Sequence, residues 1–153
     1  MPDLFESFQA VIEALNGASV PFAVCGGLAM AIHGRPRATI DIDLLAPAEA
    51  VPALVETLTA VGFRQRGATP SRLAQGQIVM HRLTKIVPGD PEVLILDVIE
   101  VQPGVTARAW DERQAVEWEG RTVTAVSRSG LIALKRLRNS ALDRADIEAL
   151  ENR

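Results

Sequence analysis

Two aspartates separated by a single residue are the clearest sign of chemistry in this sequence. Asp41 and Asp43 lie in the largely apolar segment 39–45, and residues two apart on a strand point to the same face. Two carboxylates on a partly buried face repel each other, and a divalent cation offsets that repulsion. Ligands that are all oxygens suit Mg²⁺ or Mn²⁺. The alternative is one exposed acid and a second that pairs with Arg37, but the context favours a metal site.

A third aspartate, Asp97, lies inside the most apolar run of the chain, residues 93–99. A carboxylate buried alone costs several kcal/mol, so it needs a metal ion, an arginine or hydrogen bonds. Adjacent strands could bring Asp97 beside Asp41 and Asp43, and three clustered carboxylates are what two-metal phosphoryl transfer uses. A buried pair of Asp97 with an arginine is the alternative. We predict a catalytic metal centre formed by the three aspartates.

Gly26 and Gly27 follow an apolar run and precede a short helical pattern at 28–32. Glycine permits a tight turn and a close approach of the backbone to a ligand, and a helix N-terminus offers free N–H groups to phosphate. A plain turn would explain the pair equally well. The Gly-Lys-Ser/Thr of a Walker loop and the Gly-x-Gly-x-x-Gly of a dinucleotide site are both missing.

Hydrophobic periodicity and turn residues indicate the elements that must position these residues. Residues 93–99 are apolar on both faces, as in a central strand. The sequence predicts strands at 21–25, 39–45, 77–83, 92–101, 115–118 and 121–126, helices at 3–17, 28–32, 47–61, 127–137 and 143–150, and a loop at 67–76. This pattern is typical of an α+β or mixed α/β fold, with a mixed sheet covered by helices. The length fits a single domain, 1–153.

Composition excludes several classes of protein. The chain has 153 residues and a formal net charge of −3, unlike proteins that coat nucleic acid through bulk positive charge. No apolar stretch is long enough to span a bilayer, and the N-terminus carries acids where a signal peptide needs positive charge. The single cysteine, Cys25, fits a reducing compartment. We therefore expect a cytoplasmic protein without a membrane partner.

Charge is nevertheless segregated along the chain. No acidic residue occurs between Glu56 and Asp90. One interpretation is a solvated, arginine-rich loop and strand; the other is an anion-facing wall near the metal site, for a triphosphate or an RNA acceptor. The basic residues of this stretch are Arg64, Arg66, Arg72, Arg82 and Lys85.

Other polar residues have simpler explanations. His33 is expected at a helix end with a satisfied hydrogen bond and no catalytic role. Lys135 lies four residues after Leu131, on the inward face of its helix, where it could be a snorkelling lysine. Asp143 and Asp146 are most simply helix-cap residues, favoured by the helix dipole.

Taken together, these motifs resemble the nucleotidyltransferase superfamily. Its pattern is a strand, Gly-Gly or Gly-Ser, a short helix, Asp-x-Asp on the next strand and a third carboxylate later. More narrowly, the sequence is similar to the small AbiEii-type nucleotidyltransferase toxins. The residues that match are Gly26, Gly27, Ala29, His33, Gly34, Arg37, Thr39, Asp41, Ile42, Asp43, Leu44, Lys135, Asp143 and Asp146.

The resemblance implies roles for the site residues. Asp41 and Asp43 would hold Mg²⁺ and the triphosphate, and Asp97 would complete the site and activate the acceptor hydroxyl. Gly26 and Gly27 would lie over the phosphates. Nucleotide contacts are also implied for Arg37, as a phosphate clamp or a partner of the carboxylates, and for Lys135, as a contact to a phosphate or to a carboxylate. Many members have serine where Gly27 stands, and the larger toxins have a further helical part.

The predicted activity is transfer of a nucleoside monophosphate from a nucleoside triphosphate to a hydroxyl group, with release of pyrophosphate. The acceptor could be RNA, a protein side chain or a small molecule. The resemblance also implies a toxin–antitoxin component with an antitoxin-type protein partner. The alternative is a non-catalytic nucleotide-binding module of the same fold. A glycosyltransferase metal site is a third interpretation, for which the chain looks too short.

Overall fold

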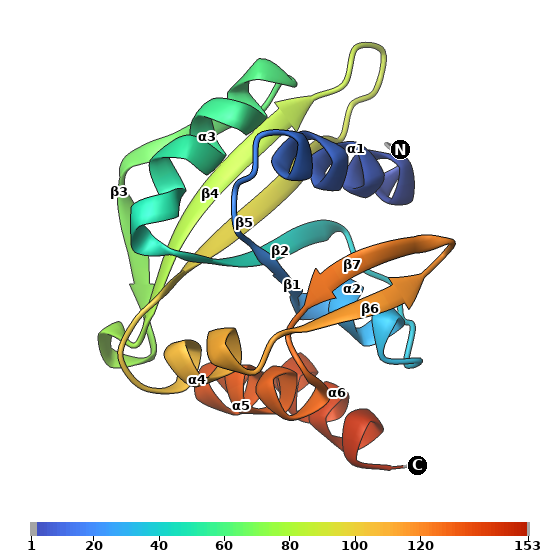
Figure 1. The fold of residues 1–153 in the computed structure, drawn as a ribbon, viewed down its shortest axis with the longest axis vertical. Helices are drawn as coiled ribbons and strands as arrows, with labels where there is room; N and C mark the ends of the chain where they lie inside the picture. The colour runs from blue at the N-terminus through green and yellow to red at the C-terminus, as the bar shows by residue number, and fades with distance from the viewer. Residues whose placement is uncertain (1–2, 153) are drawn as a thin grey trace.

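The computed structural model describes residues 3–152 and has a mixed sheet of seven strands with helices packed around it (Figure 1). The strand order is β3-β4-β5-β2-β1-β7-β6. The strands are β1 (Ala23–Cys25), β2 (Asp41–Pro47), β3 (Arg64–Leu73), β4 (Ile78–Ile86), β5 (Val93–Val101), β6 (Gln114–Trp118) and β7 (Arg121–Ala125). This architecture confirms the predicted fold class.

β2 and β5 form the centre of the sheet. They run parallel, and their register places Asp43 opposite Asp97. β4 is antiparallel to β5, and β1 is antiparallel to β2. β7 joins β1 in parallel through one pair, Val24 with Ala125, and carries β6 as a hairpin. The two central strands come from distant parts of the chain, so the folded sheet alone brings their aspartates together.

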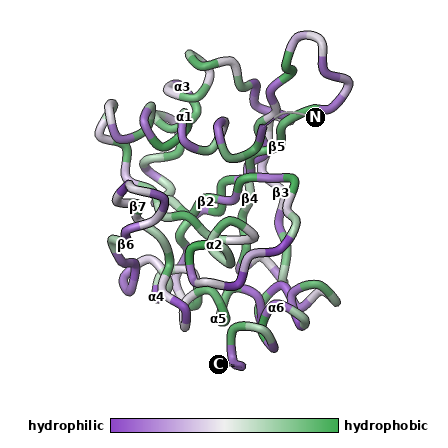
Figure 2. The backbone as a smooth tube through the Cα atoms, turned by 90° about the vertical axis from the view of Figure 1, so that its right-hand side faces the viewer, coloured by the Kyte–Doolittle hydropathy of each residue, from purple (hydrophilic) through white to green (hydrophobic). Residues whose placement is uncertain are grey.

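Two helices, α1 (Leu4–Gly17) and α3 (Val51–Ala60), pack against each other beside the sheet (Figure 1). The Asp3 carboxylate accepts a hydrogen bond from the Glu6 N–H at 3.0 Å, so Asp3 caps α1 at the start of the predicted helix. A short 3₁₀ turn, η1 (Ala48–Ala50), precedes α3. The most apolar backbone runs through the central strands and α2 (Figure 2). Fully buried core side chains include Phe8, Leu15, Leu44, Leu54 and Leu96.

The remaining helices are α2 (Gly26–Ile32), α4 (Val105–Asp111), α5 (Arg128–Arg138) and α6 (Ala141–Glu151), the last three gathered at the other end of the molecule (Figure 1). Ser127 caps α5 by accepting a hydrogen bond from the Gly130 N–H. The cap of α6 is Ser140 rather than Asp143. Asp143 is the third helical residue and completes a capping box with Ser140. All helices of residues 3–152 are too short or too polar to cross a bilayer.

Two segments differ from the prediction. Residues 67–76 were expected to form a loop, but β3 continues to Leu73 and only η2 (Ala74–Gly76) leaves the sheet. β3 has no apolar alternation; its backbone is held by pairing with β4, and the register shifts between Arg66 and Ser71. α4, a short helix that packs on α5, was not predicted from the sequence.

Candidate active site

The three predicted aspartates meet on one face of the sheet. One carboxylate oxygen of each lies within 4.8 Å of the others. Asp43 and Asp97 are 7% and 3% exposed, and Asp41 is half-buried at the start of β2. Parallel pairing of β2 with β5 produces this cluster, because register partners share a face.

Of the three aspartates, Asp43 is the one whose ionisation is most strongly opposed by its surroundings. Burial, followed by the charges of Asp41 and Asp97, raises the pKa of Asp43 to about 7. Arg138 and Lys135 act in the opposite direction. A divalent cation held between the three carboxylates would remove the repulsion, and an oxygen-only donor set suits Mg²⁺ or Mn²⁺. The cluster therefore fits the metal centre that the sequence predicts.

Asp97 also has an arginine partner. Arg82 donates from Nε to Oδ1 at 2.9 Å and from Nη2 to Oδ2 at 3.0 Å. Arg82 faces Asp97 in the β4–β5 register, and its side chain is 48% exposed. The sequence left a metal ion and an arginine as alternatives for Asp97, and the fold places Asp97 in the cluster and in the arginine pair together.

The two glycines leave no space for side chains beside the cluster. Gly26 has φ +64°, and a Cβ atom there would stand 2.1 Å from Oδ2 of Asp43. A Cβ atom on Gly27 would lie 2.5 Å from the hydroxyl oxygen of Thr39. That hydroxyl donates to Oδ1 of Asp41 at 3.3 Å. Thr39 therefore occupies the space that a serine at position 27 would need, a role not predicted from the sequence.

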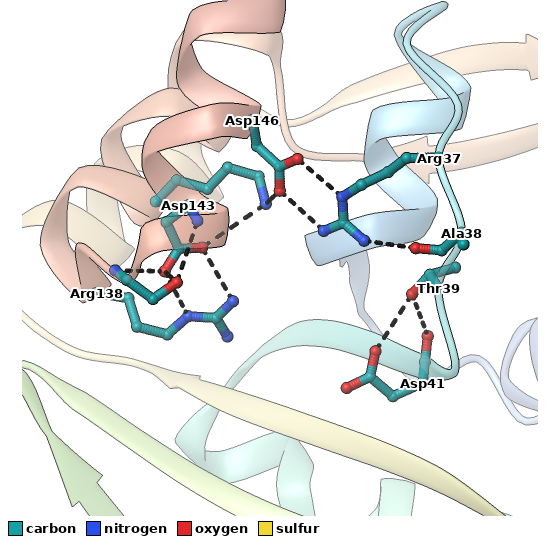
Figure 3. A network of polar contacts seen from close by, with 9 residues as sticks. Arg37, Ala38, Thr39, Asp41, Arg138, Asp143 and Asp146 are labelled. Carbon is teal, nitrogen blue, oxygen red and sulfur yellow. Dashed lines mark hydrogen bonds and ion pairs between the residues drawn. The ribbon is translucent and has the colours of Figure 1, made fainter.

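Arg37 and Lys135 both bind Asp146, and Figure 3 shows the contact of Arg37 with Asp146. Arg37 donates to the two carboxylate oxygens of Asp146 at 2.8 Å each, and the Lys135 ammonium group donates to Oδ2 at 2.8 Å. Asp146 is 3% exposed. Its prediction as a helix cap was therefore wrong: it is the centre of a buried ion cluster, because the inward faces of α5 and α6 each contribute charge here.

Arg138 links this ion cluster to the aspartates. It donates to both oxygens of Asp143 at 3.0 Å each (Figure 3). It also lines two hollows that border Asp43. Arg138 was not predicted from the sequence as a site residue, although it lies three residues after Lys135 on the same helix, which is the spacing of one helix face.

The larger of those hollows has a volume of about 310 Å³. It contains Gly27 and two of the three aspartates, but neither Asp97 nor Arg82 lines it. Its lining residues are Gly27, Arg37, Ala38, Thr39, Ile40, Asp41, Asp43, Arg138 and Leu142. The predicted nucleotide-site residues Gly27 and Arg37 thus share one concave surface with two predicted metal ligands.

The basic residues of the acid-free stretch do not form one surface. Arg82 shares the face of Asp97, and Arg66 lies opposite Arg82. Lys85 belongs to the other face, where its ammonium group stands 5.8 Å from the centre of the Phe63 ring. Arg72 also lies on that other face, because it is paired with Val79, and Val79 and Arg82 point to opposite faces of β4. The prediction of a shared wall therefore holds for only part of the set.

His33 has the structural role that the sequence predicts. Its Nε2 lies 2.8 Å from the carbonyl oxygen of Val126, which joins the end of α2 to the start of α5.

Several solved structures share this fold. Lincosamide antibiotic adenylyltransferase LnuA, bound to lincomycin, aligns with a TM-score of 0.66 and 15% identity over 96% of each chain. ANT(2'')-Ia in complex with adenylyl-2''-tobramycin aligns with a TM-score of 0.64 and 16% sequence identity, over 95% of this chain and 86% of that one. A nucleotidyltransferase-like protein from Thermotoga maritima aligns with a TM-score of 0.65 and 16% sequence identity, over 94% of this chain and 92% of that one.

No curated protein matches the sequence. A sequence model for aminoglycoside-2''-adenylyltransferases does match, over residues 7–135. The predicted superfamily is thereby confirmed, although the family matched is not the AbiEii-type one. Because the match spans most of its length, the chain belongs to the aminoglycoside-2''-adenylyltransferase family of nucleotidyltransferases.

Proposed function

We propose that this chain transfers a nucleoside monophosphate from a nucleoside triphosphate to a hydroxyl group of a small molecule. The observation that carries the proposal is the cluster of Asp41, Asp43 and Asp97, in which Asp43 packs against Gly26. Family membership supports nucleotidyl transfer. Two proteins of similar fold are described with small molecules, namely lincomycin and adenylyl-2''-tobramycin, which makes a small acceptor and ATP the first candidates.

The proposed metal ligands are Asp41, Asp43 and Asp97, and Mg²⁺ (or Mn²⁺) is the proposed ion. A bound divalent cation supplies positive charge against the phosphate oxygens. We place the phosphates over Gly26 and Gly27, where backbone can approach closely because side chains are absent.

Two cations complete the proposed nucleotide site. The Arg37 side chain is 24% exposed and lines the same hollow as Gly27, which supports a direct phosphate contact. Lys135 is buried against Asp146 at 2.8 Å, and we propose that it acts through its positive potential at Asp43.

In the proposed reaction, the acceptor oxygen forms a bond to the α-phosphorus while the bond from that phosphorus to the bridging oxygen breaks. Pyrophosphate leaves, and the hydroxyl proton passes to Asp97. The position of Asp97 supports this role: β5 lies on one side of β2, whereas β1 and the glycines that follow it lie on the other. The acceptor would then approach from the β5 side.

RNA or protein acceptors, and a toxin–antitoxin role with an antitoxin partner, are weaker proposals. An RNA surface built from Arg64, Arg66, Arg72, Arg82 and Lys85 would have to span both faces of the sheet. A non-catalytic nucleotide-binding module is the other alternative. It is less favoured because all three carboxylates are within reach of one another.

The test is label transfer from ATP labelled at the α-phosphate to a panel of hydroxylated small molecules with Mg²⁺. Asp41→Asn and Asp43→Asn should each remove product formation, because asparagine keeps the shape but removes the charge that binds the metal. Circular dichroism should show that both variants are folded. Product formation that persists at the wild-type rate in either variant would refute the proposed site.

A further inference from the structure

A row of charged side chains crosses four strands through the aspartate cluster. Arg66 on β3 is opposite Arg82 on β4. Arg82 is opposite Asp97 on β5, and Asp97 is opposite Asp43 on β2. Residues directly opposite on neighbouring strands share a face of the sheet. Two arginines therefore continue the face that carries the carboxylates.

Arg64 adds a third charge to the same face. It is opposite Thr84, which is two residues from Arg82 along β4 and so shares its face. All three arginines are exposed to solvent. Arg66 uses only its Nε in a described side-chain bond, to the Thr84 hydroxyl at 2.8 Å. We call Arg64, Arg66 and Arg82 the arginine row.

The negative charge beside the arginine row is that of the aspartate cluster, which acts on Arg82. The stretch 57–89, which carries β3 and β4, contains no acid. The carboxylate that contacts the row is Asp97, through Arg82. Neighbouring strands lie about 4.8 Å apart, so β3 is roughly 10 Å from β5. A small molecule bound at the aspartates would therefore lie within reach of the row.

The arginine row lies on the acceptor side of the site as proposed above. Gly26 and Gly27 follow β1, which is separated from β5 by β2, whereas β4 and β3 lie beyond β5. The hollow that holds Gly27, Asp41 and Asp43 includes none of the three arginines. Nucleotide and arginine row thus occupy opposite sides of the carboxylates.

We infer that the acceptor, if the proposed transfer is correct, is a small hydroxyl compound that carries an oxyanion, a phosphate or a carboxylate. Guanidinium groups bind both kinds of oxyanion with two parallel hydrogen bonds. An aminoglycoside carries several protonated amines at neutral pH and would meet like charge at the arginine row. Selectivity at this site thus differs from what the family name suggests.

The experiment varies the charge of the acceptor on one scaffold. Wild-type protein with Mg²⁺ and α-labelled ATP is given glucose, glucose 6-phosphate, glucuronate or glucosamine, with tobramycin and a short single-stranded RNA as further arms. Labelled product and acceptor binding, the latter beside a non-hydrolysable ATP analogue, are both measured. We expect the two anionic sugars to exceed glucosamine by about tenfold or more, with glucose between them. The phosphate and carboxylate arms distinguish the two oxyanions.

Two double variants provide the matched comparison. Arg64→Glu with Arg66→Glu reverses charge on the acceptor face and should invert the preference between anionic and amino sugars. Arg72→Glu with Lys85→Glu makes the same charge change away from that face and should leave the preference unchanged. Calorimetric titration with Mg²⁺ and ATP should give similar affinities for both variants and the wild type, and their melting temperatures report folding.

Each result has a defined meaning. Preference for tobramycin or glucosamine, no discrimination by charge, equal behaviour of the two double variants, or labelling of the RNA alone would overturn the inference. A fall in ATP affinity confined to the Arg64→Glu, Arg66→Glu variant would also overturn it, because the row would then serve the nucleotide. Failure of the wild type to bind ATP with Mg²⁺ would instead refute the proposed function.

Discussion

Asp43 is the aspartate whose pKa is raised both by burial and by neighbouring negative charges. It lies between Asp41 and Asp97, and its carboxylate presses against the backbone of Gly26. Such a group is poorly solvated and has no described arginine partner of its own, in contrast to Asp97, which has Arg82. Among residues 3–152, the electrostatic demand for a metal ion is therefore greatest at Asp43.

Asp43→Asn should change how the stability of the metal-free protein depends on pH. Folding raises the pKa of Asp43 from 3.8 to about 7, so its ionisation opposes folding. Wild-type stability should therefore be lost as pH rises from about 4 through 7, by at most about 4 kcal/mol. The asparagine variant should not show this loss. Urea denaturation in a chelator at pH 4.5 and 7.5 measures it, with Asp111→Asn as the control. Identical pH profiles for wild type and Asp43→Asn would contradict the assignment.

Gly26→Ala should destroy metal binding and weaken the fold. Its Cβ atom would stand 2.1 Å from the Asp43 carboxylate, at a backbone φ of +64°. Strain of this kind costs about 1–3 kcal/mol. The expected result is a lower melting temperature that Mg²⁺ no longer raises. Gly17→Ala is the matched control, because nothing beyond its chain neighbours and its own helix backbone lies within 4 Å of its Cβ position; equal effects of the two changes would show that the close approach at Gly26 is unimportant.

At the scale of elements, α6 holds the segment that leads into β2. Arg37 binds Asp146, and Arg35 donates to the carbonyl oxygens of Ala149 and Asn152 at 3.0 and 2.8 Å. Hydrogen bonds and an ion pair therefore hold the residues that precede Asp41 against α6. We expect α6 to fix the position of Asp41, a proposed metal ligand, without contacting it.

Asp146→Asn should destabilise the protein by about 3–5 kcal/mol, because it leaves Lys135 and Arg37 without their shared carboxylate in a buried setting. It should also weaken Mg²⁺ binding by loosening the segment before Asp41. Glu151→Gln, on the same helix but in an exposed pair with Arg136, should cost under about 1 kcal/mol. Chemical denaturation and Mg²⁺ titration report both effects, and similar losses for the two variants would exclude the proposed role of Asp146.

The sequence predicts some of these elements well and others poorly, for physical reasons. β2 and β5 were predicted because alternating and continuous apolar residues are local signals, and the placement of Asp43 and Asp97 followed from them. β3 was missed because Gly67, Pro70 and the surrounding polar residues favour a loop, and pairing with β4 overrides that local preference. The cluster around Asp146 was missed because its partner Arg37 is 109 positions away.

For the molecule as a whole, the small net charge is the sum of a negative cluster and a group of positive side chains that lie close together. The three aspartates form a negative cluster, while the arginine row and the cations of α5 surround it on the same side of the sheet. A cation that binds this negative cluster in the folded state alone is expected to increase the global stability of the protein.

Mg²⁺ should therefore raise the melting temperature of the wild-type protein. At a concentration one hundred times its dissociation constant, the gain would be about 2.7 kcal/mol. Asp41→Asn and Asp43→Asn should melt higher than wild type in a chelator and respond little to Mg²⁺, since relieved repulsion replaces the metal. Scanning calorimetry at constant ionic strength, adjusted with KCl, measures this. A response to KCl equal to that of Mg²⁺ would indicate general screening instead of a site.

The contacts of Arg35 and Arg37 with α6 also have a consequence for folding during synthesis. During synthesis, the carboxylates of β2 leave the ribosome about a hundred residues before Asp146 does. Contacts between such distant positions close late and slow folding. The contacts of Arg35 and Arg37 with α6 can therefore form only after α6 has been synthesised, and until then the segment before Asp41 lacks these restraints.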